Sequence, residues 1–181
     1  NGNPSTAIAI KEDASNASFT FEGASFDAPY YAVYPAAAAT AFADGTYTLS
    51  LPKTQTYVGS DKFSPEASLM LGYSAESGKV AFRHAMAYIR LTLSVGDAPV
   101  RSVTFESNNQ EAMAGTFKAT CTDGAWTLAK ETGSVYAVDL VCEGEGAAIG
   151  DKMLVAIPAG TYAEGFRIVV KDTQSHYMVK K

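Results

Sequence analysis

The chain has few charged residues and a slight excess of acidic ones. Only 18% of its 181 residues are charged, whereas an average soluble domain has roughly 25%. Fourteen Lys and Arg oppose nineteen Asp and Glu, which gives a formal net charge of -5. Nucleic acids and anionic membrane surfaces attract proteins through a basic field. We therefore expect no nucleic-acid partner and no anionic membrane partner.

Long hydrophobic runs are also missing. No stretch approaches the roughly 20 apolar residues that span a bilayer, so we expect no direct membrane span. Residues 1–4 (NGNP) have neither the basic end nor the apolar run of a signal peptide. An exported form would therefore lack its leader here.

Histidine is scarce, with only His84 and His176. Neither has a cysteine or carboxylate nearby at the spacing of a metal site, so we expect no metal and no cofactor. His84 shares the apolar face of an expected strand, which favours a structural histidine satisfied within the core or sheet. His176 follows a turn, where solvent exposure is expected.

Cysteine is limited to Cys121 and Cys142. An even count in an exported protein suggests a disulfide. However, if residues 117–121, 125–129 and 134–142 form a meander, the two cysteines lie two strand spacings apart. That separation is roughly 9.5 Å, beyond the usual Cα limit of about 7 Å. The spacing favours two reduced thiols and leaves the disulfide as the alternative.

Motifs of catalysis are absent from the sequence. It contains no serine nucleophile elbow, phosphate-binding glycine loop or dinucleotide fingerprint. The Gly144-Glu145-Gly146 segment is interpreted as a turn, because its acidic residues would repel a phosphate. A glycosidase-type carboxylate pair is disfavoured, since the acidic residues are spread over strand ends and loops. We therefore predict that the protein is not an enzyme.

Alternating hydrophobic residues, bounded by Gly, Pro, Asn and Asp, are abundant. This period of two predicts β-strands, and so many short strands predict an all-β, two-sheet antiparallel β-sandwich with long loops and little helix. Asp123-Gly124 is the preferred pair for a type I′ hairpin. The strands are expected at 46–51, 80–86, 88–95, 100–106, 116–122, 125–129, 134–142, 153–157 and 166–171.

Two features interrupt this pattern. The buried face changes from even to odd positions near Ala87, which predicts a bulge or bend there. Short helical turns are expected after Pro35 and at Ser64-Pro65-Glu66.

The domain organisation is expected to be an N-terminal arm at 1–18 followed by one β-sandwich module at 19–181. A composition shift near Gly72 suggests a sub-boundary as an alternative. The arm is interpreted either as mobile or as an edge strand awaiting a partner. The chain stops within what resembles a final hairpin strand, which leaves open a further C-terminal domain.

Aromatic residues are frequent, with ten Tyr, nine Phe and one Trp. Tyr30, Tyr31 and Tyr34, set around two prolines, are candidates for a platform that binds sugar or protein. The alternative is ordinary core and surface packing in a sandwich, which this composition favours.

Several segments, read in order from about residue 19 to 171, together resemble the fimbrillin-like proteins of Gram-negative anaerobes. They are YAVYP at 31–35, LSLPKTQTY at 49–57, VAFRHAMA at 80–87 with RLTL at 90–93, MAGTF at 113–117 and IPAGTY at 157–162.

The resemblance implies transthyretin-like β-sandwich domains in a pilus or surface-anchor subunit, exported as a lipoprotein and joined to its neighbours by added β-strands. Two features depart from the family. No cysteine lies near the N-terminus, and the first arginine is Arg83. The processing region of the family is therefore expected either to lie upstream of Asn1 or to be missing altogether.

These observations lead to one main hypothesis and one alternative. The main hypothesis is a surface structural or adhesive protein, namely a fimbrial subunit, tip or anchor. Its partners would be other fimbrial subunits or itself, through strand addition, with a host protein or glycan as a further partner. The alternative is a carbohydrate-binding module of a surface glycan-uptake system. Both place the protein at the cell surface, on the outer membrane or in a fimbrium.

Overall fold

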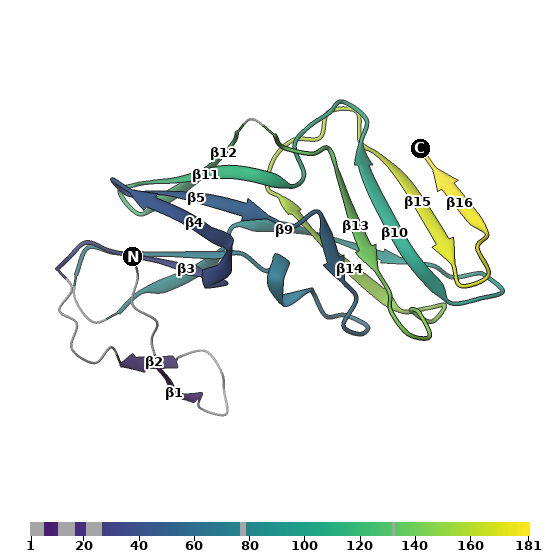
Figure 1. Ribbon diagram of the computed structural model, residues 1–181, viewed down its shortest axis with the longest axis horizontal. Coiled ribbons are helices and arrows are strands. Elements are labelled where there is room, and N and C mark those ends of the chain that lie inside the picture. Colours follow the sequence, from purple (N-terminus) through teal and green to yellow (C-terminus); the bar gives the residue numbers. More distant parts are fainter. Residues whose placement is uncertain (1–5, 11–16, 21–26, 77–78, 132) are drawn as a thin grey trace.

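The structure is a computed structural model that describes residues 6–10, 17–20, 27–76, 79–131 and 133–181. These residues form an all-β, sandwich-like fold of mostly antiparallel strands with two short 3-10 turns (Figure 1). The predicted all-β class with little helix is therefore confirmed. Among the described residues, no helix has the length and apolar character to cross a bilayer.

One half of the molecule packs two sheets face to face. Sheet I has the order β3-β7-β8, and sheet II the order β12-β11-β5-β4. Leu49, Leu71 and Phe117 lie in the core between them. The strands are β3 (Tyr30–Tyr34), β7 (Met70–Ser74) and β8 (Ala81–His84) in sheet I, and β4 (Ala39–Ala43), β5 (Thr46–Leu51), β11 (Gly115–Thr122) and β12 (Ala125–Lys130) in sheet II.

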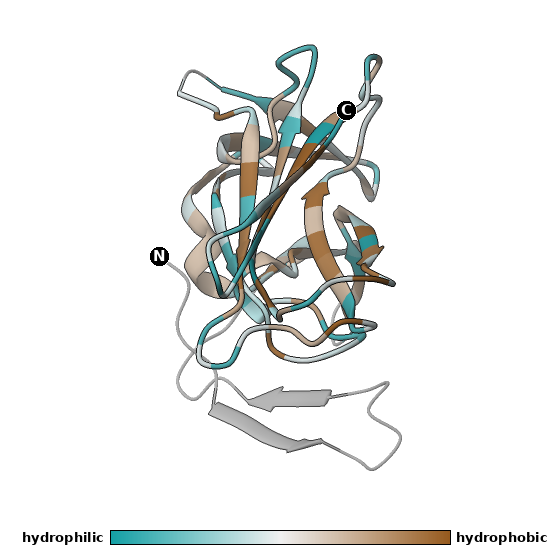
Figure 2. Cartoon of the chain, turned by 90° about the vertical axis from the view of Figure 1, so that its right-hand side faces the viewer, coloured by the Kyte–Doolittle hydropathy of each residue, from teal (hydrophilic) through white to brown (hydrophobic). Residues whose placement is uncertain are grey.

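The other half packs sheet III, β14-β9, against sheet IV, β16-β15-β10-β13-β6. Its core contains Phe105, Val138 and Met153. Figure 2 shows hydrophobic residues along the strands, while several loops at the top of the view are hydrophilic. The strands are β9 (Met86–Thr92) and β14 (Lys152–Pro158) in sheet III, and β6 (Thr54–Thr56), β10 (Val100–Ser107), β13 (Ala137–Val141), β15 (Phe166–Asp172) and β16 (Tyr177–Lys180) in sheet IV.

Strand β9 joins the two halves. Met86 at its start packs in the first core, and Ile89 and Leu91 pack against the second. The predicted even-numbered buried face is wrong for β8, because Phe82 and His84 are exposed and Arg83 lies opposite the buried Leu71. The predicted bend does exist, as a change of sheet. The strand breaks at Ala85, where β8 leaves its pairing with β7 and β9 pairs with β14. One expected inward residue, Val95, is instead 78% exposed beyond the end of β9.

The sequence analysis did not predict the strands β3, β4, β6 and β7. Two other local predictions, a hairpin and two short turns, agree with the structure. The hairpin between β11 and β12 has positive φ at both Asp123 (49°) and Gly124 (82°), as a type I′ turn requires. The two short turns are η1 (Ala36–Ala38) and η2 (Pro65–Ala67). Ser64 does not cap η2; its hydroxyl accepts a bond from the Thr56 N–H instead.

The expected N-terminal arm at 1–18 lies partly outside the described residues. Its described parts contribute to a separate two-stranded antiparallel sheet of β1 (Thr6–Ile10) and β2 (Ala17–Thr20). Gly72, near the suggested sub-boundary, lies in β7, the central strand of sheet I.

Candidate functional site

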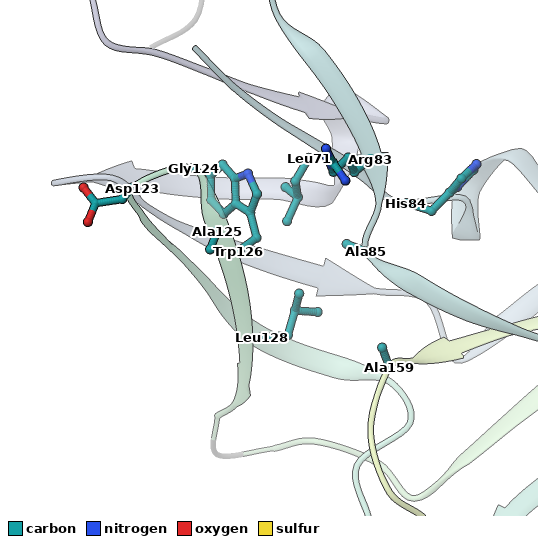
Figure 3. A pocket seen from close by; sticks show the side chains of 10 residues that line it. All are labelled: Leu71, Arg83, His84, Ala85, Asp123, Gly124, Ala125, Trp126, Leu128 and Ala159. Carbon is teal, nitrogen blue, oxygen red and sulfur yellow. The ribbon is translucent and has the colours of Figure 1, made fainter. Parts of the chain in front are cut away.

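A groove separates the edges of sheets I and II. On one side of this sandwich, η1 connects β3 to β4 and links the two sheets. On the other side, the sheets end at β8 and β12. The groove there has a volume of about 580 Å³ (Figure 3). Its lining includes Leu71, Arg83 and Ala85, then Trp126 and Leu128 from β12, and Ala159 after β14.

The floor of the groove is part of the hydrophobic core. Leu71 is buried, and Ala85, Trp126 and Leu128 pack against the same core cluster. An open sandwich edge thus exposes apolar side chains that elsewhere are covered by a neighbouring strand. Such a floor suits the alternate side chains of an added β-strand.

The edge of β12 presents unpaired main-chain groups to this side. Just after β12, the Glu131 N–H donates to the Thr116 C=O at 2.9 Å. This bond shows that the odd-numbered residues of β12 are the ones whose main-chain groups bond β11. In an antiparallel ladder every second residue bonds the partner strand, and the others point outward. The N–H and C=O groups of Trp126, Leu128 and Lys130 therefore point away from β11.

Strand β8 has the same property. The Ala85 N–H donates to the Leu69 C=O at 3.0 Å, so Arg83 and Ala81 follow with bonds to β7. The main-chain groups of Phe82 and His84 point outward. Within the described part of the chain, neither β8 nor β12 has a second neighbouring strand. Each edge can therefore accept one more strand.

The edge of β14 is closed by contrast. The buried side chain of Gln55 bonds both the N–H and the C=O of Ala156. At Lys152, the N–H donates to the Ser60 hydroxyl and the C=O accepts from the Asp61 N–H. Pro158, at the end of β14, has no N–H. These contacts protect β14 from strand addition, and no such contacts cover the outward main-chain groups of β8 and β12 among the described residues.

The predicted tyrosine platform is divided by strand alternation. In β3, Tyr31 packs against the core between sheets I and II, whereas Tyr34 is 46% exposed on the other face. Tyr30 is half-buried on the face of Tyr34. The structure does not bring the three rings together on one surface.

Sequence reasoning missed the aromatic cluster that Tyr31 joins instead. Its ring lies 5.2 Å from Phe42, 5.3 Å from Tyr73 and 6.2 Å from Trp126, between ring centroids. Trp126 also stacks on Tyr47 at 5.8 Å. The buried Trp126 Nε1 has no hydrogen-bond acceptor among the described residues. No sequence signal marks this cluster, because it joins strands far apart in the chain.

The two histidines are each in contact with a polar partner. His84, in β8, is exposed rather than in the core, and its Nδ1 lies 3.0 Å from the Tyr88 hydroxyl. Tyr88 in turn stacks on Phe63. His176 is exposed, as expected, and pairs with Asp172. In the described ranges, no group of three or more His, Cys, Asp or Glu has the geometry to hold a metal ion.

Cys121 and Cys142 are unbonded, but the meander that suggested this does not exist. Strand β13 leaves β12 and pairs with β10 and β6 in sheet IV. Cys121 thus lies in sheet II, and Cys142 directly follows a strand of sheet IV. Cys142 is fully buried in the second core, where burial raises its pKa to about 11.

Comparisons with protein-family models, with curated proteins and with solved structures gave no match in any of the three.

Proposed function

We propose that this protein is a structural subunit of a surface assembly, in the manner of a fimbrial subunit, tip or anchor, and that it accepts a β-strand of a neighbouring subunit in the groove between β8 and β12. The observation that carries the proposal is the pair of unpaired edges on either side of an apolar groove. The resemblance of several sequence segments to fimbrillin-like proteins is the reason for proposing that the assembly lies at the cell surface.

A donated strand stabilises such a groove in two ways. Its main chain bonds the outward groups of Phe82 and His84, or those of Trp126 and Leu128. Its alternate side chains cover Ala85 and Leu128, which are only partly buried, and this removes apolar surface from water at about 25 cal/mol per Å². The function is mechanical linkage, and it requires no catalytic group.

The carbohydrate-binding alternative has less support from the geometry. It relies on Tyr30, Tyr31 and Tyr34 acting together, and Tyr31 faces the core. Glycan-array binding that is lost in a Tyr34→Ala variant would nevertheless favour this alternative over strand addition.

Proline substitution gives a direct test of the groove. Phe82→Pro and Lys130→Pro each remove an outward N–H without breaking the ladder to β7 or β11, since proline is tolerated where the N–H of an edge strand faces solvent. Phe82→Ala and Lys130→Ala are matched controls that keep the N–H.

The probes are three fluorescent ten-residue peptides of alternating valine and threonine with terminal lysines. The central valine is kept in one and replaced by Asp or Lys in the others. At least one should bind the wild-type protein and both alanine controls, with weaker binding to the double proline variant. Failure of all three peptides to bind, or equal binding to the proline variant, would refute the acceptor groove.

The proposed location at the cell surface is tested by a separate measurement. Antibodies against the purified protein should label filaments or the outer surface of the source cells in immunogold microscopy. Labelling confined to the cytoplasm would contradict a role in a surface assembly.

A further inference from the structure

Arg83 is an inward-pointing charge on an edge strand. It lies opposite Leu71 in the β7–β8 ladder, so its side chain starts on the same face as that buried leucine. Figure 3 shows Arg83 reaching from β8 to the side of Leu71 and Trp126, while His84 points the other way. Arg83 and His84 both line the groove, and Arg83 is the one that reaches toward Leu71 and Trp126 (Figure 3).

This guanidinium has no ion-pair or hydrogen-bond partner within the described part of the chain. Asp123, which also lines the groove, does not pair with it. Five other lysines and arginines of the described residues do form bridges with carboxylates, namely Lys53, Arg90, Lys118, Lys152 and Arg167. Arg83 is the lysine or arginine that lines this groove, so it places a positive charge there in a chain of net charge -5.

We infer that Arg83 makes the groove selective for a donor strand that carries an acidic side chain on its inward face. The inference rests on the proposed strand-acceptor function and specifies the occupant. A carboxylate opposite Arg83 can form a two-pronged, charge-assisted pair with the guanidinium. A purely apolar strand would instead cover the guanidinium without a partner, which disfavours binding through the cost of desolvation.

Selectivity therefore arises from repulsion as well as attraction. Apolar and basic strands are rejected, and this rejection also limits indiscriminate edge-to-edge association.

The same three peptides test this inference by their rank order. For the wild-type protein, the Asp peptide should bind about tenfold more tightly than the valine peptide, and the Lys peptide should bind most weakly. Arg83→Gln should weaken the Asp peptide and strengthen the valine peptide. Arg83→Glu should reverse the order of the Asp and Lys peptides.

Lys180→Gln on β16 is the control for a change in net charge, and it should leave the order unchanged. If Arg83 only hinders strand addition at the β8 edge, Arg83→Gln would strengthen the binding of all three peptides. This outcome would overturn the inference. Equal binding of the three to wild type would also overturn it while leaving the acceptor groove intact. If no peptide binds, the proposed function fails and the inference fails with it.

Discussion

The side-chain amide of Gln55 bonds the main chain of Ala156, which lies 101 residues further along the chain. Its Nε2 donates to the Ala156 C=O at 2.6 Å, and its Oε1 accepts from the Ala156 N–H at 2.9 Å. The amide therefore occupies a position on β14 where a neighbouring strand would otherwise bond. Gln55 is only 1% exposed.

Gln55→Leu should destabilise the protein markedly. It leaves the N–H and C=O of Ala156 buried and unpaired, at about 1–3 kcal/mol for each group. The measurement is the free energy of unfolding from urea denaturation. Thr54→Leu, one residue away on the same strand and exposed, is the control and should change little. A Gln55→Leu protein as stable as wild type would show that this pair does not contribute to stability.

The two thiols should differ sharply in reactivity. Cys142 is buried, and its pKa is raised to about 11 by that burial, so little thiolate is present at neutral pH. Cys121 is partly exposed on β11. A disulfide-exchange reagent such as DTNB should modify one thiol in the folded protein and two in urea.

Cys121→Ser should remove the fast reaction, whereas Cys142→Ser should leave it. Equal rates for both thiols, or no reaction together with a mass two hydrogens lower, would contradict this assignment.

The sequence predicts what depends on neighbouring residues. The alternation of Val103 and Phe105 identifies the buried face of β10, and Asp123-Gly124 identifies the hairpin, because both signals lie within a few residues. The sequence also indicates a bend near Ala87, and the strand does break at Ala85, but the alternation assigned the wrong face of β8 to the core.

What the sequence cannot predict is how strands far apart are assigned to sheets. The meander drawn through Cys121 and Cys142 was wrong because β13 pairs with β10 and β6. The groove has the same origin, since Arg83 and Trp126 meet only after β8 and β12 become the edges of facing sheets. For Tyr30, Tyr31 and Tyr34, spacing alone does not reveal that one ring faces inward.

Glu111 should make stability depend on pH in the acid range. Hydrogen bonds from Ser107 above all, and from the Ala163 N–H and Asn109, lower its pKa from 4.5 to about 2. Because the pKa is lower in the folded state, the contribution is present above about pH 4.5 and is lost as pH falls towards 2.

Glu111→Gln tests this contribution. The variant should be less stable than wild type at pH 7, and the difference in the free energy of unfolding should shrink between pH 4.5 and pH 2. A difference that stays constant over this range would mean that the carboxylate charge is not what stabilises the loop.

Gly124 lies at the tip of the β11–β12 hairpin, and its replacement by alanine should destabilise the protein for two separable reasons. Its φ is +82°, a left-handed conformation that costs an L-residue about 1 kcal/mol relative to glycine. An added Cβ would also lie 3.2 Å from Cδ1 of Tyr73, closer than ordinary contact, so the ring must shift. Gly150 is the matched control, because its φ is +94° and an added Cβ would meet nothing within 4 Å. Both alanine variants should lower the free energy of unfolding in urea, and Gly124→Ala should lower it more. Equal losses would mean that Tyr73 yields at no cost and that the backbone conformation alone accounts for the glycine.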